Sequence, residues 1–141
     1  MVTSFAHAAL TVRDMDKSVD FYTRVLGFEK AFDIPEPGTG KPWIVYLAVA
    51  PGQFLELFYG GTTPVREFSK EITGFNHLCF GVSDIRAAAE RVEKAGVALD
   101  RPVSFGADGN GQCWVRDPDR NRIELMQIMP NSPQATYFAE K

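Results

Sequence analysis

The chain has 141 residues, of which 45% are hydrophobic and 23% are charged, and its formal net charge is −3. This length and composition suit one globular domain with its own hydrophobic core. The slight acidity and the lack of a basic run argue against a nucleic-acid surface, and no apolar run approaches the ~20 residues of a membrane span. The first residues show no basic and apolar leader, so we expect a cytoplasmic protein with no membrane or nucleic-acid partner.

The first half of the chain has the pattern of a strand, a helix and three further strands. Asp14 is placed to cap the helix, which carries apolar residues at helical spacing and ends at Gly27. The loop 33–42 is rich in Pro and Gly; it is either a lid over a site or an inert connection. The predicted strands cover residues 6–12, 28–33, 43–49 and 53–59.

The second half repeats this order, with Asp84 placed to cap a helix that ends at Gly96. A tight turn at residues 117–120 joins the last two strands. The predicted strands cover residues 78–82, 97–105, 112–116 and 122–129. We expect one domain over residues 1–141, with module one at about 5–59, a linker at 60–74, module two at 75–129 and a tail at 130–141. The tail is either a flexible end or a docked arm.

Both cysteines, Cys79 and Cys113, fall in strand-like runs, and no CxxC pair exists. The sequence favours two reduced and mostly buried thiols. A disulfide between the two residues is the alternative.

A histidine and a glutamate recur in each half of the chain. His7 precedes Glu56 by 49 residues, and His77 precedes Glu124 by 47. The flanking residues repeat as well, so the two pairs belong to an internal duplication. Two imidazoles and two carboxylates are a plausible ligand set for a divalent metal ion.

Period-2 alternation predicts which side chains share a strand face with these four residues. Glu56 lies between Phe54 and Phe58, an unusual place for a charge, because a buried carboxylate is costly unless it is paired or bound to a metal. The candidate pocket-lining residues are Phe54, Phe58, Cys79, Arg122 and Met126, with Trp43 and Trp114 as further aromatic candidates. For each aromatic residue the alternative is core packing, and for Arg122 it is a surface position at a strand end.

The chain resembles the vicinal oxygen chelate superfamily, which includes glyoxalase I, from about His7 to Ile128. The resemblance rests on the opening His7…Val12-Arg-Asp14…Ser18…Phe21-Tyr22…Leu26-Gly27-Phe28 and the closing Asp117-Pro-Asp119…Asn121-Arg-Ile-Glu124-Leu125. It agrees with the element order, since both imply an α+β fold of two βαβββ modules that form a curved open barrel. It also implies a homodimer.

In glyoxalase I-like members, one residue from each of four strands holds a metal ion, and His7, Glu56, His77 and Glu124 fill those positions here. The resemblance therefore implies one divalent ion per site, either Zn, Ni, Co, Mn or Fe. It also implies a metal-dependent lyase or isomerase that acts on a small α-hydroxycarbonyl or thiol hemithioacetal. The ion would polarise the carbonyl, and Glu124 or Glu56 would transfer the proton.

Two other classes of the superfamily are alternatives: an Fe(II)-dependent dioxygenase, and a non-catalytic protein that binds a small molecule or confers resistance. The chain also departs from bacterial glyoxalase I, which usually has an Arg four residues after the first His and an Asn four residues after the first Glu, both contacting glutathione. Thr11 and Gly60 occupy those positions here. Thr11 is thus a candidate substrate-binding residue, and we expect poor recognition of glutathione.

Overall fold

The computed structural model describes residues 1–139, which divide into two compact units between Val65 and Arg66. Unit 1 contains β1 (His7–Thr11), α1 (Met15–Asp20), the π-helical turn η1 (Phe21–Val25), β2 (Glu29–Pro35), β3 (Pro42–Ala50) and β4 (Gln53–Phe58). Unit 2 contains β5 (Leu78–Gly81), α2 (Ile85–Lys94), β6 (Arg101–Phe105), β7 (Gly111–Arg116), β8 (Arg122–Gln127) and α3 (Pro133–Ala139). Both units thus have the predicted βαβββ order.

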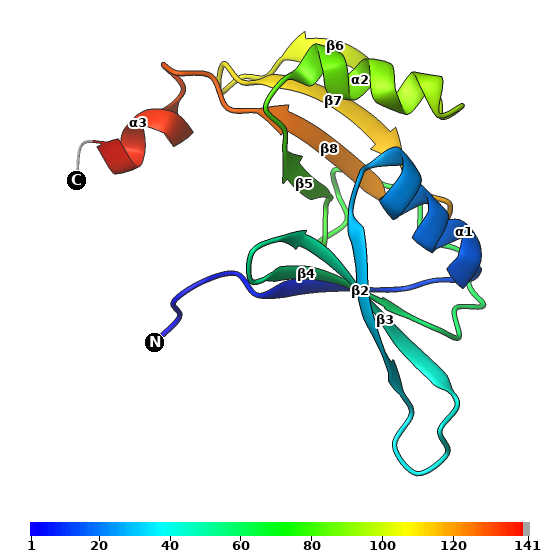
Figure 1. Cartoon of the computed structure of the whole chain (residues 1–141). Coiled ribbons are helices and arrows are strands. Elements are labelled where there is room, and N and C mark those ends of the chain that lie inside the picture. Colours follow the sequence, from blue (N-terminus) through cyan, green and yellow to red (C-terminus); the bar gives the residue numbers. More distant parts are fainter. Residues whose placement is uncertain (140–141) are drawn as a thin grey trace. The chain divides into compact units, whose positions relative to one another are not determined.

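The strands pair into two four-stranded sheets with the same topology, β1-β4-β3-β2 and β5-β8-β7-β6 (Figure 1). The first strand of each unit runs parallel to the last, and the other neighbours are antiparallel. Ala9 lies opposite Glu56 in one parallel ladder, and Cys79 lies opposite Glu124 in the other. The predicted α+β fold of two βαβββ modules is confirmed.

Each predicted aspartate caps its helix. The Asp14 carboxylate accepts the backbone N–H of Lys17 at 3.1 Å, and Asp84 accepts two N–H groups at 2.9 and 3.0 Å. These bonds satisfy donors that the first helical turn leaves free. Gly27 and Gly96 follow the helices with φ of 88° and 82°, a conformation that a side chain disfavours.

Each sheet buries one row of side chains under its helix. In unit 1 the fully buried residues include Tyr22, Leu47, Leu55 and Leu57. In unit 2 they include Val92, Cys113, Val115 and Ile123, and α2 packs against β6, β7 and β8. The apolar spacing in the sequence therefore gives each unit its own core.

Several predicted boundaries differ from the structure. The strand predicted over 97–105 begins only at Arg101. Before it, the Val97 N–H donates to Val92 O, so residue 97 still belongs to the turn that ends α2. The loop predicted over 33–42 shortens to residues 36–41, because β2 and β3 pair as far as Pro35 and Pro42. The turn η1 was not predicted.

The thiols also differ from expectation. Both cysteines are free, but Cys79 is exposed and only Cys113 is buried. Cys79 lies on the face of β5 away from the core, since the neighbouring Leu78 is buried. In the tail, α3 is tied to its unit by a hydrogen bond from Gln134 to Asp108 of 2.7 Å. No helix within residues 1–139 combines the length and apolar character needed to cross a membrane.

Candidate metal centre

In unit 1, His7 and Glu56 come together on adjacent strands. His7 Nδ1 lies 3.3 Å from Glu56 Oε1; the histidine side chain is 50% exposed, whereas that of the glutamate is 6% exposed. Tyr46 lies opposite Glu56 on β3, and its hydroxyl donates to the carboxylate. This hydrogen bond raises the pKa of Tyr46 above its usual value.

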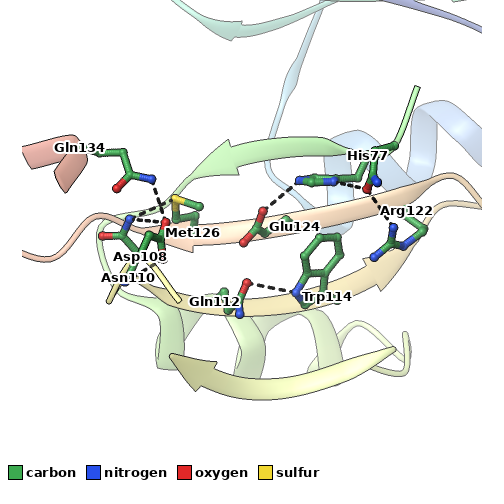
Figure 2. A network of polar contacts seen from close by, with 10 residues as sticks. His77, Asp108, Asn110, Gln112, Trp114, Arg122, Glu124, Met126 and Gln134 are labelled. Carbon is green, nitrogen blue, oxygen red and sulfur yellow. Dashed lines mark hydrogen bonds and ion pairs between the residues drawn. The ribbon is translucent and has the colours of Figure 1, made fainter. Parts of the chain in front are cut away.

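In unit 2, His77 and Glu124 come together in the same way (Figure 2). His77 Nε2 lies 3.1 Å from Glu124 Oε2, and the glutamate side chain is 8% exposed. The other ring nitrogen, Nδ1, lies 2.7 Å from the side-chain oxygen of Asn76. Both nitrogens of this ring therefore have a polar partner, one on each side.

The contacts of Asn76 identify the protonated nitrogen of His77. Arg122 Nη1 lies 2.9 Å from the same Asn76 atom. Because a guanidinium only donates, that atom must be the amide oxygen, and Nδ1 must carry the hydrogen that points at it. The Nε2 lone pair then faces an oxygen of Glu124, which is stable only with a proton or a cation between the two atoms.

These distances suit two ligands of one metal ion. Imidazole nitrogens and carboxylate oxygens bind transition metals at about 2.0–2.2 Å, so neighbouring ligands at a right angle lie about 3 Å apart. The observed separations are 3.3 Å in unit 1 and 3.1 Å in unit 2. Within residues 1–139, no three His, Cys, Asp or Glu side chains gather as a metal cluster, so each unit supplies one pair. The donor chemistry fits a divalent ion.

Aromatic side chains surround the pair in unit 1. Phe54 lies next to Tyr46 and Phe32, with ring centroids 5.9 and 6.0 Å away, and Phe32 stacks on Tyr46 at 4.5 Å. Phe58 packs edge-on against Trp43 at 5.8 Å. The predicted residues Phe54 and Phe58 therefore belong to an aromatic face that continues across β2, β3 and β4.

Trp43 and Thr11 lie at the margins of this face. Trp43 lines a hollow of about 210 Å³ together with Ile34, Ile44 and Tyr59. Thr11, at the end of β1, pairs with Phe58 in the parallel ladder and is exposed.

A second cluster surrounds the pair in unit 2. The guanidinium carbon of Arg122 lies 3.8 Å from the ring centroid of Phe68 and 4.7 Å from that of Trp114. Trp114 also meets the His77 ring at 4.7 Å, and its Nε1 donates to Gln112 (Figure 2). Partial burial lowers the pKa of Arg122, and nearby arginines add to this shift.

Met126 lies two residues beyond Glu124 on β8, and Cys79 lies two residues beyond His77 on β5. The Met126 sulfur accepts a weak hydrogen bond of 3.7 Å from Asn110. Although Cys79 is exposed as a residue, desolvation of its sulfur, followed by the charge of Glu124, raises its pKa to about 12. Cys79 thus holds its proton at neutral pH.

Three residues of these surroundings were missed from sequence: Tyr46, Phe68 and Asn76. Tyr46 lies in a predicted strand, but only the β3–β4 register places it beside Glu56. Phe68 lies in the predicted linker and carries no periodic signal. Asn76 had a usable signal, since it is a polar residue directly before a candidate ligand.

Comparison with known proteins gives one consistent assignment. The family model of the Glyoxalase/Bleomycin resistance protein/Dioxygenase superfamily matches residues 4–125. A lactoylglutathione lyase of Pseudomonas putida is 33% identical over 151 residues, covering 89% of this chain and 86% of the relative. A lactoylglutathione lyase of Pseudomonas aeruginosa is 30% identical over 152 residues, covering 90% of this chain and 84% of the relative.

A solved structure agrees with this assignment. The crystal structure of a glyoxalase family protein from Enterococcus faecalis is 25% identical, with a TM-score of 0.73, and the match covers 87% of this chain and 96% of that one. The chain therefore belongs to the Glyoxalase/Bleomycin resistance protein/Dioxygenase superfamily.

Proposed function

We propose that this protein is a metal-dependent lyase or isomerase of the glyoxalase I type, and that His7, Glu56, His77 and Glu124 hold one divalent ion. The observation that carries the proposal is a buried carboxylate facing an imidazole nitrogen in each unit, at 3.3 and 3.1 Å. A buried carboxylate needs a compensating charge, and a metal ion supplies it to both pairs.

Proton transfer between neighbouring carbons is the reaction that these side chains support. A bound divalent ion acts as a Lewis acid toward the carbonyl oxygen of the substrate. A glutamate oxygen removes the proton from the hydroxyl-bearing carbon and returns it to the neighbouring carbonyl carbon, while the hydroxyl proton passes to the former carbonyl oxygen. No atom is gained or lost, so the net reaction is an isomerisation. Glu124 is our first choice for this base and Glu56 the second.

The substrate we propose is a small α-hydroxycarbonyl or the hemithioacetal of a thiol. The aromatic face beside Glu56 offers apolar contacts, and Thr11 brings no charge to its margin. Gly60 has a φ of 101°, and a Cβ on Gly61 would lie 2.8 Å from the Val12 backbone. Gly60 itself, which has open space around it, provides no side-chain amide where bacterial glyoxalase I usually has one.

A panel assay under anaerobic conditions tests the proposal. The protein is stripped of metal, loaded separately with Zn, Ni, Co or Mn, and offered hemithioacetals of several thiols and other α-hydroxycarbonyls. We expect isomerisation of at least one compound by a loaded form and none by the stripped form. Oxygen consumption with Fe(II) and a catechol, without any isomerisation, would instead assign the protein to the dioxygenases. A stripped protein that binds no ion would assign it to the binding proteins.

A further inference from the structure

We propose that Asn76 is a positioning residue, which fixes the tautomer of His77 so that Nε2 is free to bind the metal ion. This inference rests on the proposed function. Asn76 Oδ1 lies 2.7 Å from His77 Nδ1 and accepts its hydrogen. The remaining nitrogen is then an acceptor that points at Glu124. A metal ion needs this unprotonated nitrogen, and partners on the far side of a ligand imidazole set the tautomer in metal sites generally.

Arg122 fixes the orientation of the Asn76 amide. An asparagine amide can turn over and present its NH₂ group, which would favour the opposite tautomer of His77. The Arg122 donor at 2.9 Å prevents this, because two donors cannot face each other. Arg122 is itself held by cation–π contacts with the rings of Phe68 and Trp114. Arg122 and His77 therefore both donate to the same Asn76 oxygen, and Nε2 of His77 faces Glu124.

The duplicated half of the chain lacks this arrangement. His7 is preceded by Ala6, which has no side-chain acceptor. His7 presents Nδ1 to Glu56 and is half exposed, whereas His77 presents Nε2 and its side chain is 30% exposed. The internal repeat thus holds one preorganised histidine and one that lacks a side-chain acceptor before it. We assign to Asn76 the difference between the two histidines in the nitrogen that faces the glutamate.

Nitrogen NMR of the metal-free protein tests the assignment without any assay of activity. The chain has two histidines, so spectra of the wild type and of His7→Gln identify the His77 ring. We expect a hydrogen on Nδ1 in the wild type, because this nitrogen lies 2.7 Å from the Asn76 oxygen. In Asn76→Ala we expect it on Nε2, where it donates to Glu124. Asn76→Asp keeps an acceptor oxygen and restores the wild-type spectrum.

Metal affinity is the second readout. We expect Asn76→Ala to weaken Zn²⁺ binding about 10–100-fold, the usual effect of removing a partner of a ligand histidine. Asn76→Asp should recover the affinity, and the exposed Asn131→Ala, which makes the same chemical change elsewhere, should leave the affinity and the His77 spectrum as in the wild type.

The outcomes separate the inference from the proposed function. A wild-type His77 without a hydrogen on Nδ1 would overturn the role of Asn76. So would an Asn76→Ala variant that keeps both the wild-type spectrum and the wild-type affinity. A wild-type protein that binds no divalent ion would overturn the proposed function, whatever the spectra show.

Discussion

At the scale of single residues, the proposed site depends on two carboxylates that the fold buries. As whole residues, Glu56 and Glu124 are 5% and 6% exposed, and each has a histidine nitrogen within 3.3 Å of a carboxylate oxygen. The sequence singled out all four residues of the two pairs, because a charge on an apolar strand face stands out and the duplication shows it twice. It could not predict which ring nitrogen faces the carboxylate, since that depends on neighbours such as Asn76 and Tyr46.

Replacing Glu124 with Gln tests the residue that we assign as the base. The amide keeps the size of the side chain but supplies neither the charge for the metal nor a proton acceptor. We expect an intact fold, weaker metal binding and a kcat about 10²–10⁴-fold lower, the usual contribution of general acid–base catalysis. Steady-state kinetics of the metal-loaded variant measure this. Wild-type turnover would show that the base is another residue, and Glu56 is the first to test.

Cys113 predicts a pH dependence of stability. The thiol is buried, and burial raises its pKa to about 11 from the ordinary value near 9. The folded state therefore holds the proton more tightly, so this contribution to stability is complete below about pH 9 and declines up to about pH 11. We expect urea unfolding to show a steeper loss of stability over this interval in the wild type than in Cys113→Ala. Parallel curves for the two proteins would contradict this.

At the scale of elements, local chemistry made the helices predictable. The aspartate caps and the glycines after them act within one turn of chain, so Asp14, Asp84, Gly27 and Gly96 were found from sequence. Register was less accessible, because β3 and β4 pair with a shift between Ala48 and Ala50 that alternation alone does not reveal. For this reason Tyr46 was not expected beside Glu56.

The turn between β7 and β8 depends on a buried aspartate. Asp117 is 4% exposed, and its carboxylate accepts the N–H groups of Asp119 and Asn121 and the side-chain amide of Asn121, at 2.7–3.0 Å. Asp117→Ala removes the acceptor of these three hydrogen bonds, so we expect the free energy of unfolding to fall by about 2–4 kcal/mol. The control Asp20→Ala removes an exposed ion pair with Arg24 and should have a much smaller effect. Equal effects in urea unfolding would contradict the role of Asp117.

A cation placed at the end of β1 should improve the turnover of a glutathione substrate. Thr11 is exposed and pairs with Phe58, so a longer side chain there meets solvent. We expect the wild type to process the methylglyoxal–glutathione hemithioacetal with a kcat/KM below ~10⁴ M⁻¹s⁻¹, under the usual enzyme range. Thr11→Arg supplies a cation for a glutathione carboxylate and should raise this value about tenfold, as expected for a hydrogen bond to a charged group. Thr11→Met, equally long but uncharged, is the control; an equal gain in both variants would exclude a charge effect.

At the scale of the whole molecule, the chain contains the same arrangement of helix and strands twice. Both units have the same strand order, a capped helix and one His–Glu pair; His7 lies on β1, whereas His77 directly precedes β5. The repeat in the sequence predicted this doubling, and membership of the superfamily agrees with it. The copies have diverged around the pair: aromatic residues flank Glu56, whereas an arginine, a tryptophan and an asparagine surround His77.

The most direct test of the proposed function combines metal counting with catalysis. The protein is stripped with a chelator, reloaded with Zn, Ni, Co or Mn in turn, and assayed for isomerisation without oxygen, while elemental analysis gives the ions bound per chain. We predict that the stripped protein is inactive and that one ion per complete site restores activity. We also predict that Glu124→Gln lowers both the number of ions bound per chain and the isomerisation activity. Full isomerase activity in the stripped protein would contradict a metal-dependent mechanism.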